Sequence, residues 1–241
     1  MNKLLDKVAI VTGGGSGIGR GIALALAGEG VKVVICGRRQ QRVDESLALM
    51  PDGSQVIGVR ADVSQVDDVD RVVKTALETY GPIDILVNNA GIGGSGPIHS
   101  HDTALWTRVM DVNLCGAFHM ARAVLPSMRQ QESGHIVNIS SESGLEYYPG
   151  NGAYGVSKHA MNALGEYIQR ENQELNIRVN TICPGMVVTE MTENSPGLDH
   201  NKCLYPDDIA ELVTWLLTRR SNIKIGTPIL IQTMQNPWGR T

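Results

Sequence analysis

Two residues that could do chemistry together, Tyr154 and Lys158, stand four positions apart in the stretch AYGVSKHAM at 153–161. Side chains at i and i+4 share one face of a helix, so the phenol and the ammonium are expected to be neighbours. A free tyrosine titrates near ~10, but a cation within a few ångströms stabilises the phenolate and lowers that pKa. The spacing predicts an acid/base tyrosine tuned by a lysine. The alternative is a structural tyrosine beside an exposed lysine.

A glycine-rich turn follows the first apolar run, in VAIVTGGGSGIGRGIALALA at 8–27. The turn fits G-x-x-x-G-x-G at Gly13, Gly17 and Gly19 and lacks a strict G-x-G-x-x-G. A strand, a turn without side chains and a helix N-terminus together let backbone N–H groups approach a pyrophosphate. We therefore expect a dinucleotide site. The alternative is a tight turn that needs glycine for its own conformation.

The end of the second apolar run, VVICGRR at 33–39, indicates which nucleotide is bound. An acidic residue at this point would hold the ribose 2′-hydroxyl of NAD, but Gly37 stands there. Arg38 can clamp a 2′-phosphate, so the sequence favours NADP, with NAD the less favoured cofactor. The alternative is that both arginines are solvated, and Arg39 is expected to face solvent.

Short β-branched runs alternate with longer amphipathic stretches along the chain. Strands are expected at 8–12, 31–36, 56–60, 83–88, 135–140, 177–182 and 228–233, and helices at 17–28, 39–49, 66–80, 103–130, 154–174 and 207–219. The strands are almost wholly apolar, as in a sheet that is covered on both faces. The alternation predicts an α/β fold: a doubly wound, Rossmann-type three-layer sandwich around a parallel sheet of about seven strands, in one domain over 1–241.

Composition excludes several other classes of function. With 42% apolar residues, a net charge of −4 and a pI near 5.9, the chain has no basic character for a nucleic-acid partner. We expect no membrane span and no signal peptide, and His99 and His101 lack a third ligand at metal-binding spacing. Four cysteines far apart, without C-x-x-C, predict free thiols in a reducing cytoplasm: Cys36, Cys115, Cys183 and Cys203.

Taken together, these motifs resemble the short-chain dehydrogenase/reductase family of the compact, single-domain type. The resemblance is carried by TGGGSGIG, NNAG at 88–91, Asn113, Ser141 thirteen residues before Tyr154, the Y-x-x-x-K pair and PGMVVT at 184–189. It implies an NADP-dependent oxidoreductase that transfers a hydride between nicotinamide and a carbonyl or secondary alcohol. Two alternatives stay open: an epimerase or dehydratase with the same residue pair, and a regulator that senses the nucleotide without turnover.

The resemblance also implies a role for each catalytic residue. Tyr154 is the expected acid/base. Lys158 is expected to hold the nicotinamide ribose and to lower the tyrosine pKa. Ser141 orients the substrate oxygen, and Asn113 anchors a water that relays protons to solvent.

The cofactor contacts implied by the resemblance include adenine contacts at Asp62 and Val63 and contacts to the carboxamide and pyrophosphate at Val187 and Thr189. Ser16 stands where NADP-using relatives often carry a second basic residue. The full cofactor set is Gly13, Ser16, Gly17, Ile18, Gly19, Arg38, Asp62, Val63, Asn89, Ala90, Gly91, Tyr154, Lys158, Pro184, Gly185, Val187 and Thr189.

The remaining expectations concern the substrate and the assembly. Residues 189–205 are expected to form a short, polar substrate lid. Residues 234–241 form a tail that departs from the family's usual last turn, which puts tetramer pairing across the last strand in doubt. Glu142, Glu146, Tyr147 and Tyr148 suggest a small or polar substrate. The helices at 103–130 and 154–174 are expected to mediate a homo-oligomer, at least a dimer and more readily a tetramer.

Overall fold

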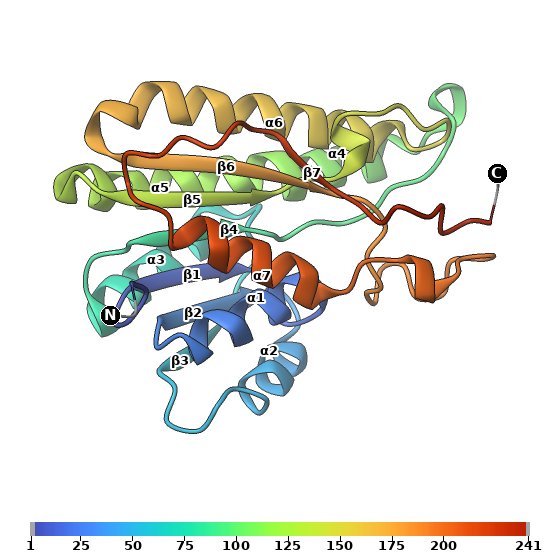
Figure 1. Ribbon diagram of the computed structural model, residues 1–241. Helices are drawn as coiled ribbons and strands as arrows, with labels where there is room; N and C mark the ends of the chain where they lie inside the picture. The colour runs from blue at the N-terminus through green and yellow to red at the C-terminus, as the bar shows by residue number, and fades with distance from the viewer. Residues whose placement is uncertain (1–2, 240–241) are drawn as a thin grey trace.

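The protein's structure is a computed structural model that describes residues 3–239, and it is built around a single parallel sheet (Figure 1). Its strands are β1 (Val8–Thr12), β2 (Lys32–Gly37), β3 (Val56–Arg60), β4 (Ile85–Asn88), β5 (Gly134–Ile139), β6 (Ile177–Pro184) and β7 (Ile229–Ile231). The order across the sheet is β3-β2-β1-β4-β5-β6-β7, and every neighbouring pair is parallel. The predicted doubly wound α/β fold is confirmed.

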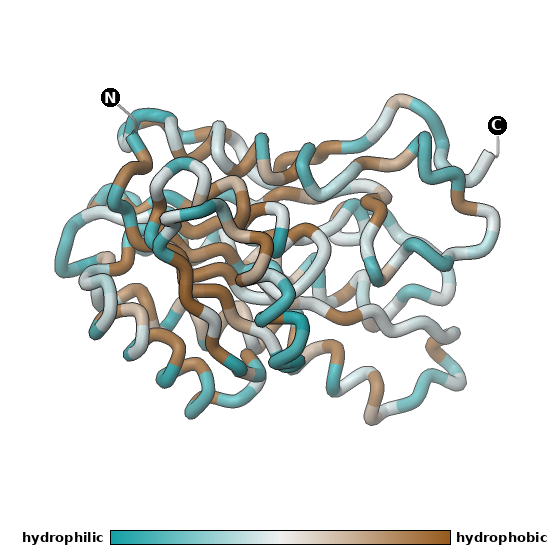
Figure 2. The backbone as a smooth tube through the Cα atoms, turned by 90° about the horizontal axis from the view of Figure 1, so that it is seen from below, coloured by the Kyte–Doolittle hydropathy of each residue, from teal (hydrophilic) through white to brown (hydrophobic). Residues whose placement is uncertain are grey.

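Helices cover both faces of this sheet. They are α1 (Gly17–Gly28), α2 (Gln40–Leu47), α3 (Val66–Tyr80), α4 (Thr103–Met110), α5 (Gly116–Gln131), α6 (Gly152–Asn172) and α7 (Pro206–Leu217). Successive strand side chains point to opposite faces, so Ala9 and Val11 pack with α1 and α7 while Val8 and Ile10 pack with α3 and α5. Figure 2 shows that hydrophobic residues are concentrated in the strands at the interior of the molecule. The three layers follow from strands that are apolar on both sides.

The single helix expected over 103–130 is wrong in one respect. The chain is helical throughout, but a π-helical turn at Asp111–Cys115 separates α4 from α5. Such turns insert one extra residue and are frequent at functional sites. Here the turn contains Asn113, whose fully buried carboxamide bonds to a neighbouring loop and to α6.

The last strand is shorter than the expected run at 228–233. It ends at Ile231, and the Thr233 hydroxyl then donates to the Lys202 carbonyl at 2.7 Å. That bond ties the chain to the 189–205 segment and carries it away from the sheet, so the polar residues Gln232 and Thr233 lie outside the strand.

Within residues 3–239, no helix is both long and apolar enough to cross a membrane, and no three His, Cys, Asp or Glu side chains gather as metal ligands. The four cysteines are free thiols. Of the two histidines considered as metal ligands, His101 packs its ring edge-on against Trp106, with ring centroids 5.8 Å apart.

Candidate active site

A cavity of about 460 Å³ opens at the carboxyl edge of the sheet. It lies where β1 meets β4, the point from which the strand order runs outward in both directions. Open α/β sheets bind ligands at such a switch point, because the loops on either side diverge there. The cavity extends from the arginines after β2, past the glycine turn, to the first turn of α6.

The glycine turn is packed so closely that only glycine fits. The Asn89 Nδ2 donates to the Thr12 carbonyl at 2.9 Å and lies behind the turn. A Cβ on Gly19 would come within 2.4 Å of that nitrogen and of the Gly13 carbonyl oxygen, and Gly13 itself has φ +67°. Backbone without side chains therefore faces the cavity at the N-terminus of α1, as a phosphate cradle requires.

At the other end of the cavity, the Lys158 Nζ donates to the Ile139 carbonyl at 2.8 Å and lies 5.5 Å from the centroid of the Tyr154 ring. A hydrogen bond joins Tyr154 to Ser141, whose Oγ also accepts from the Ser143 N–H at 3.1 Å. Three of the four side chains expected to be catalytic, Ser141, Tyr154 and Lys158, therefore lie together.

The electrostatics differ from the expectation that Lys158 lowers the tyrosine pKa. Burial raises the pKa of Tyr154, the Ser141 hydrogen bond opposes this rise, and the nearby Glu142 adds to it. Burial also lowers the pKa of Lys158 to about 8. Lys158 is almost fully buried and Tyr154 is partly buried, and loss of water disfavours the charged form of each. For the protein by itself, the expected lowering is wrong.

Asn113 is bonded through every polar atom of its carboxamide. Its Oδ1 accepts from the Ile92 N–H at 2.8 Å, and its Nδ2 donates to the Ile92 carbonyl and to the Ser157 Oγ, each at 3.0 Å. The side chain thus fixes the loop after β4 against α6. Its relay water stays a prediction.

Comparisons with known proteins agree with this geometry. The model of a family described as short chain dehydrogenase matches residues 7–197. The chain belongs to the short-chain dehydrogenase family. An uncharacterized oxidoreductase of Staphylococcus epidermidis is 36% identical, over 94% of this chain and 97% of that protein. A second one, from Staphylococcus saprophyticus, is 39% identical over the same shares.

Solved structures of short-chain dehydrogenases show the same likeness. Levodione reductase superposes with a TM-score of 0.87 at 31% identity, covering 95% of this chain and 96% of that one. Actinorhodin polyketide ketoreductase, solved with NADPH, gives 0.85 at 30% identity, covering 90% and 93%. An alcohol dehydrogenase of Thermococcus sibiricus, solved with 5-hydroxy-NADP, gives 0.85 at 29% and covers 98% of each chain. The protein is thus an oxidoreductase of this family, whose members use NAD or NADP.

Most of the residues expected to contact the cofactor line the cavity. They are Gly13, Ser16, Gly17, Ile18, Arg38, Asp62, Val63, Asn89, Ala90, Gly91, Tyr154, Lys158 and Thr189.

Four other members of the expected cofactor set do not line the cavity. Gly19 lies behind the turn. Pro184 ends β6, the Gly185 N–H donates to the Ile231 carbonyl, and Val187 is buried and bridges to Leu204. The cofactor contacts assigned to these four residues stay predictions.

Asp62, which was expected to contact the adenine, has a partner that was not identified from the sequence. Burial alone would raise the pKa of Asp62, but hydrogen bonds from Ser64 and Arg108 outweigh it and hold that pKa below its usual value. Arg108 lies on α4, 46 residues along the chain, and no local spacing signals the pair.

Arg39, expected to face solvent, is also paired. Its side chain is 58% exposed, yet both Nη atoms donate to Glu190, at 2.8 and 2.6 Å. Arg42 and Glu190 line the cavity as well, and neither was identified from the sequence. A signal was present, because three arginines at 38–42 stand without an acidic residue among them.

Residues 189–205 lead away from the cavity and come back to pair with residues 186–188. The Leu204 N–H donates to the Met186 carbonyl at 2.8 Å, and the Val188 N–H donates to the Leu204 carbonyl at 2.9 Å. The tail lies against this segment, since the Asp199 N–H donates to the Pro237 carbonyl. Residues 240–241 of the expected tail lie outside the described part of the chain. That 189–205 acts as a substrate lid stays a prediction.

The buried ammonium of Lys158 generates a stability prediction. Its pKa of about 8, against an ordinary 10.5, means that the folded protein binds this proton less tightly than the unfolded chain does. Lys158→Met removes the charge and keeps the length, so the variant should gain up to about 3 kcal/mol in free energy of unfolding at pH 7. Loss of the bond to the Ile139 carbonyl offsets about 1 kcal/mol of that gain.

The sign of the pH dependence follows. As pH rises from 8 to 10.5, the wild type gains stability, because its folded state has already lost the proton that the unfolded chain still holds. The advantage of the variant should therefore shrink over this interval, as measured by urea unfolding at pH 7 and pH 10. Lys74→Met, at an exposed lysine on α3, should show no such trend. An equal difference at both pH values would contradict the prediction.

Proposed function

We propose that this short-chain dehydrogenase is an NADP-dependent carbonyl reductase or alcohol dehydrogenase that acts in the cytoplasm, where its free thiols stay reduced. One observation carries the proposal. A single cavity is lined by Tyr154 and Lys158 at one end and by Gly37 and Arg38 at the other. This lining suits a dinucleotide that meets a proton donor at one end and a phosphate-binding cation at the other.

The residues present fit such a cofactor. The closely packed glycine turn offers bare backbone to a pyrophosphate, Asp62 and Val63 line the wall proposed for the adenine, and Arg38 faces the proposed 2′-phosphate position. Lys158 would hold the nicotinamide ribose. When bound, the nicotinamide supplies or accepts the hydride.

The chain's own residues then handle the proton. In reduction, Tyr154 donates its proton to the carbonyl oxygen while Ser141 orients that oxygen by a hydrogen bond. In oxidation, the phenolate takes the proton of the alcohol. Because burial raises the pKa of Tyr154, the residue stays protonated at neutral pH, which suits the reductive direction.

The walls beside the tyrosine suggest a small or polar substrate. Glu142 is partly buried, forms a hydrogen bond with Tyr148, and lies close enough to Tyr154 to influence its pKa. The names of the solved relatives point to carbonyl and alcohol chemistry, as levodione reductase, a polyketide ketoreductase and an alcohol dehydrogenase.

The function is tested by a screen of carbonyl and alcohol substrates in which turnover is measured from the absorbance of the reduced nicotinamide. Turnover separates the proposed reaction from the epimerase, dehydratase and sensing alternatives. Tyr154→Phe keeps the ring and deletes the proton, so turnover should fall about 10²-fold or more with cofactor affinity nearly unchanged. Tyr80→Phe, at the opposite edge of the sheet, is the matched control. Turnover of the Tyr154 variant within a few-fold of wild type would remove this residue from the mechanism.

Cofactor selectivity is predicted from the end of β2. A charge-assisted contact between Arg38 and a phosphate contributes roughly 1.5–3 kcal/mol, or about 10- to 100-fold in favour of NADP. This preference should weaken as salt is added, because the site lies near the surface. Gly37→Asp with Arg38→Leu should reverse it. A Cβ at Gly37 would meet only Val43, at an ordinary 3.5 Å, so the aspartate fits.

The measurement is kcat/KM with each cofactor for wild type and the double variant. Arg220→Leu, an exposed arginine far from the cavity, controls for the loss of one positive charge. Equal values for NADP and NAD in the wild type would show that Arg38 does not select the phosphate.

We also propose a homo-oligomer, at least a dimer. Phe118 on α5 and Val156 and Tyr167 on α6 are 46%, 48% and 67% exposed, an apolar surface that a second copy would cover. Light scattering at micromolar concentration should give the mass of a dimer or tetramer, and Tyr167→Glu should shift it toward the monomer. A monomeric mass for the wild type would reject the proposal.

A further inference from the structure

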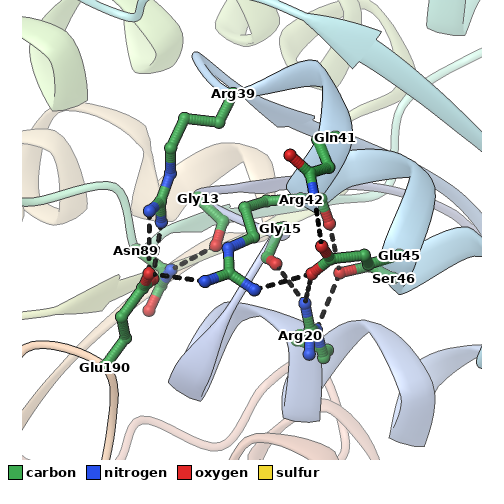
Figure 3. A network of polar contacts seen from close by, with 10 residues as sticks. All are labelled: Gly13, Gly15, Arg20, Arg39, Gln41, Arg42, Glu45, Ser46, Asn89 and Glu190. Atoms are coloured by element: carbon green, nitrogen blue, oxygen red, sulfur yellow. Dashed lines mark hydrogen bonds and ion pairs between the residues drawn. The ribbon is translucent and has the colours of Figure 1, made fainter.

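Glu190 pairs with Arg39 and Arg42 (Figure 3), and all three residues line the cavity. Arg39 forms a two-fold contact with its carboxylate, and the Arg42 Nη2 donates to its Oε1 at 2.9 Å. Beyond them the network continues, because Arg42 also pairs with Glu45 at 2.7 Å, and Glu45 lies 3.5 Å from Arg20. Glu190 is the member of this network that comes from the segment following β6.

The start of α2 needs an anion. Arg39 is its N-cap and Arg42 lies in its first turn, which contains no acidic residue. The positive end of a helix dipole disfavours cations, so two arginines there destabilise the helix unless a negative group joins them. Glu190 supplies that group, and Arg39 holds its pKa down at about 2, so the carboxylate is ionised throughout the physiological range.

The same position is where a 2′-phosphate would bind. Gly37, Arg38, Arg39, Arg42 and Glu190 all line one cavity. A phosphate near Arg38 would be drawn to the guanidiniums of Arg39 and Arg42. Glu190 already engages both Nη atoms of Arg39 and the Nη2 of Arg42. Phosphate and Glu190 are both anions, so they repel each other and compete for the same donors.

We propose that Glu190 is an internal anion that occupies Arg39 and Arg42, and that the 2′-phosphate of NADP displaces it. Binding of the phosphate then releases residues 190–198 from α2. This inference rests on the proposed preference for NADP. It makes Glu190 a determinant of cofactor selectivity: its carboxylate weakens phosphate binding and leaves a nucleotide without the phosphate unaffected.

The test compares adenosine 2′,5′-bisphosphate with 5′-AMP, two probes that differ only in the 2′-phosphate and need no turnover. In calorimetric titrations, Glu190→Gln should bind the bisphosphate about 2- to 10-fold more tightly than wild type, since exposed ion pairs contribute only modestly. Affinity for 5′-AMP should not change. Glu193→Gln, which makes the same charge change in the same segment, is the control and should match wild type.

Salt gives a second signature. In the wild type one anion replaces another, so the affinity for the bisphosphate should fall gently with ionic strength. In Glu190→Gln the arginines are free of the carboxylate, and the decline should be steeper. Amide hydrogen exchange gives a third: the bisphosphate, and not 5′-AMP, should raise exchange at residues 190–198 in the wild type.

The possible results separate a failure of the Glu190 inference from a failure of the proposed NADP preference. If both proteins bind the two probes equally well, the proposed NADP preference fails. If both prefer the bisphosphate by the same factor, the preference stands and the role of Glu190 fails. If Glu190→Gln lowers the affinity for both probes, Glu190 contributes to nucleotide binding and does not compete with the phosphate. That result also overturns the inference.

Discussion

The site depends on how the backbone is satisfied where β1 and β4 end. Their loops diverge at the switch point, so N–H and C=O groups there lose the strand partners they would otherwise have. Side chains replace those partners. The Thr12 Oγ1 accepts from the N–H groups of Asn89 and Ala90, each at 3.0 Å, and the Asn113 carboxamide bonds both the N–H and the C=O of Ile92. These bonds fix the loop after β4, which forms one wall of the cavity.

The same bonds fix the position of α6, the helix that carries Tyr154 and Lys158. The Asn113 Nδ2 also donates to the Ser157 Oγ, and that hydroxyl donates to the Tyr154 carbonyl at 2.7 Å. A continuous path of hydrogen bonds thus joins the loop after β4 to the turn of α6 that carries the phenol. The π-helical turn has its reason here, since it lets a buried polar side chain reach both partners without leaving any of its polar atoms unsatisfied. Asn113 thus helps to hold the turn of α6 that carries Tyr154 in place.

The sequence predicted the features that depend on local pattern. Strand and helix order, the glycine turn and the meeting of Ser141 with Tyr154 all follow from periodicity, spacing and motif, because parallel strands bring their carboxyl ends to one edge. It failed where tertiary contacts decide. No spacing announces that Arg39 and Arg42 meet Glu190, about 150 residues further on, or that Arg108 meets Asp62. The prediction that the pKa of Tyr154 is lowered was wrong for a related reason. Proximity to a cation can be inferred from sequence, whereas the burial of Tyr154 and Lys158 cannot.

Burial divides the cavity into two electrostatic regimes, and each of the two proposed tasks, proton transfer and cofactor selection, falls in one of them. Lys158 is 3% exposed, so its charge acts strongly on nearby groups and is costly to keep. The arginines and Glu190 stand in partial contact with solvent, where charges interact weakly and exchange partners easily. Proton transfer needs the first environment, because a desolvated acid responds to small changes in its surroundings. Selection between two cofactors needs the second. A phosphate can replace a carboxylate on an exposed arginine at little cost, whereas the same exchange in the buried region would leave an unpaired charge in a medium that cannot solvate it.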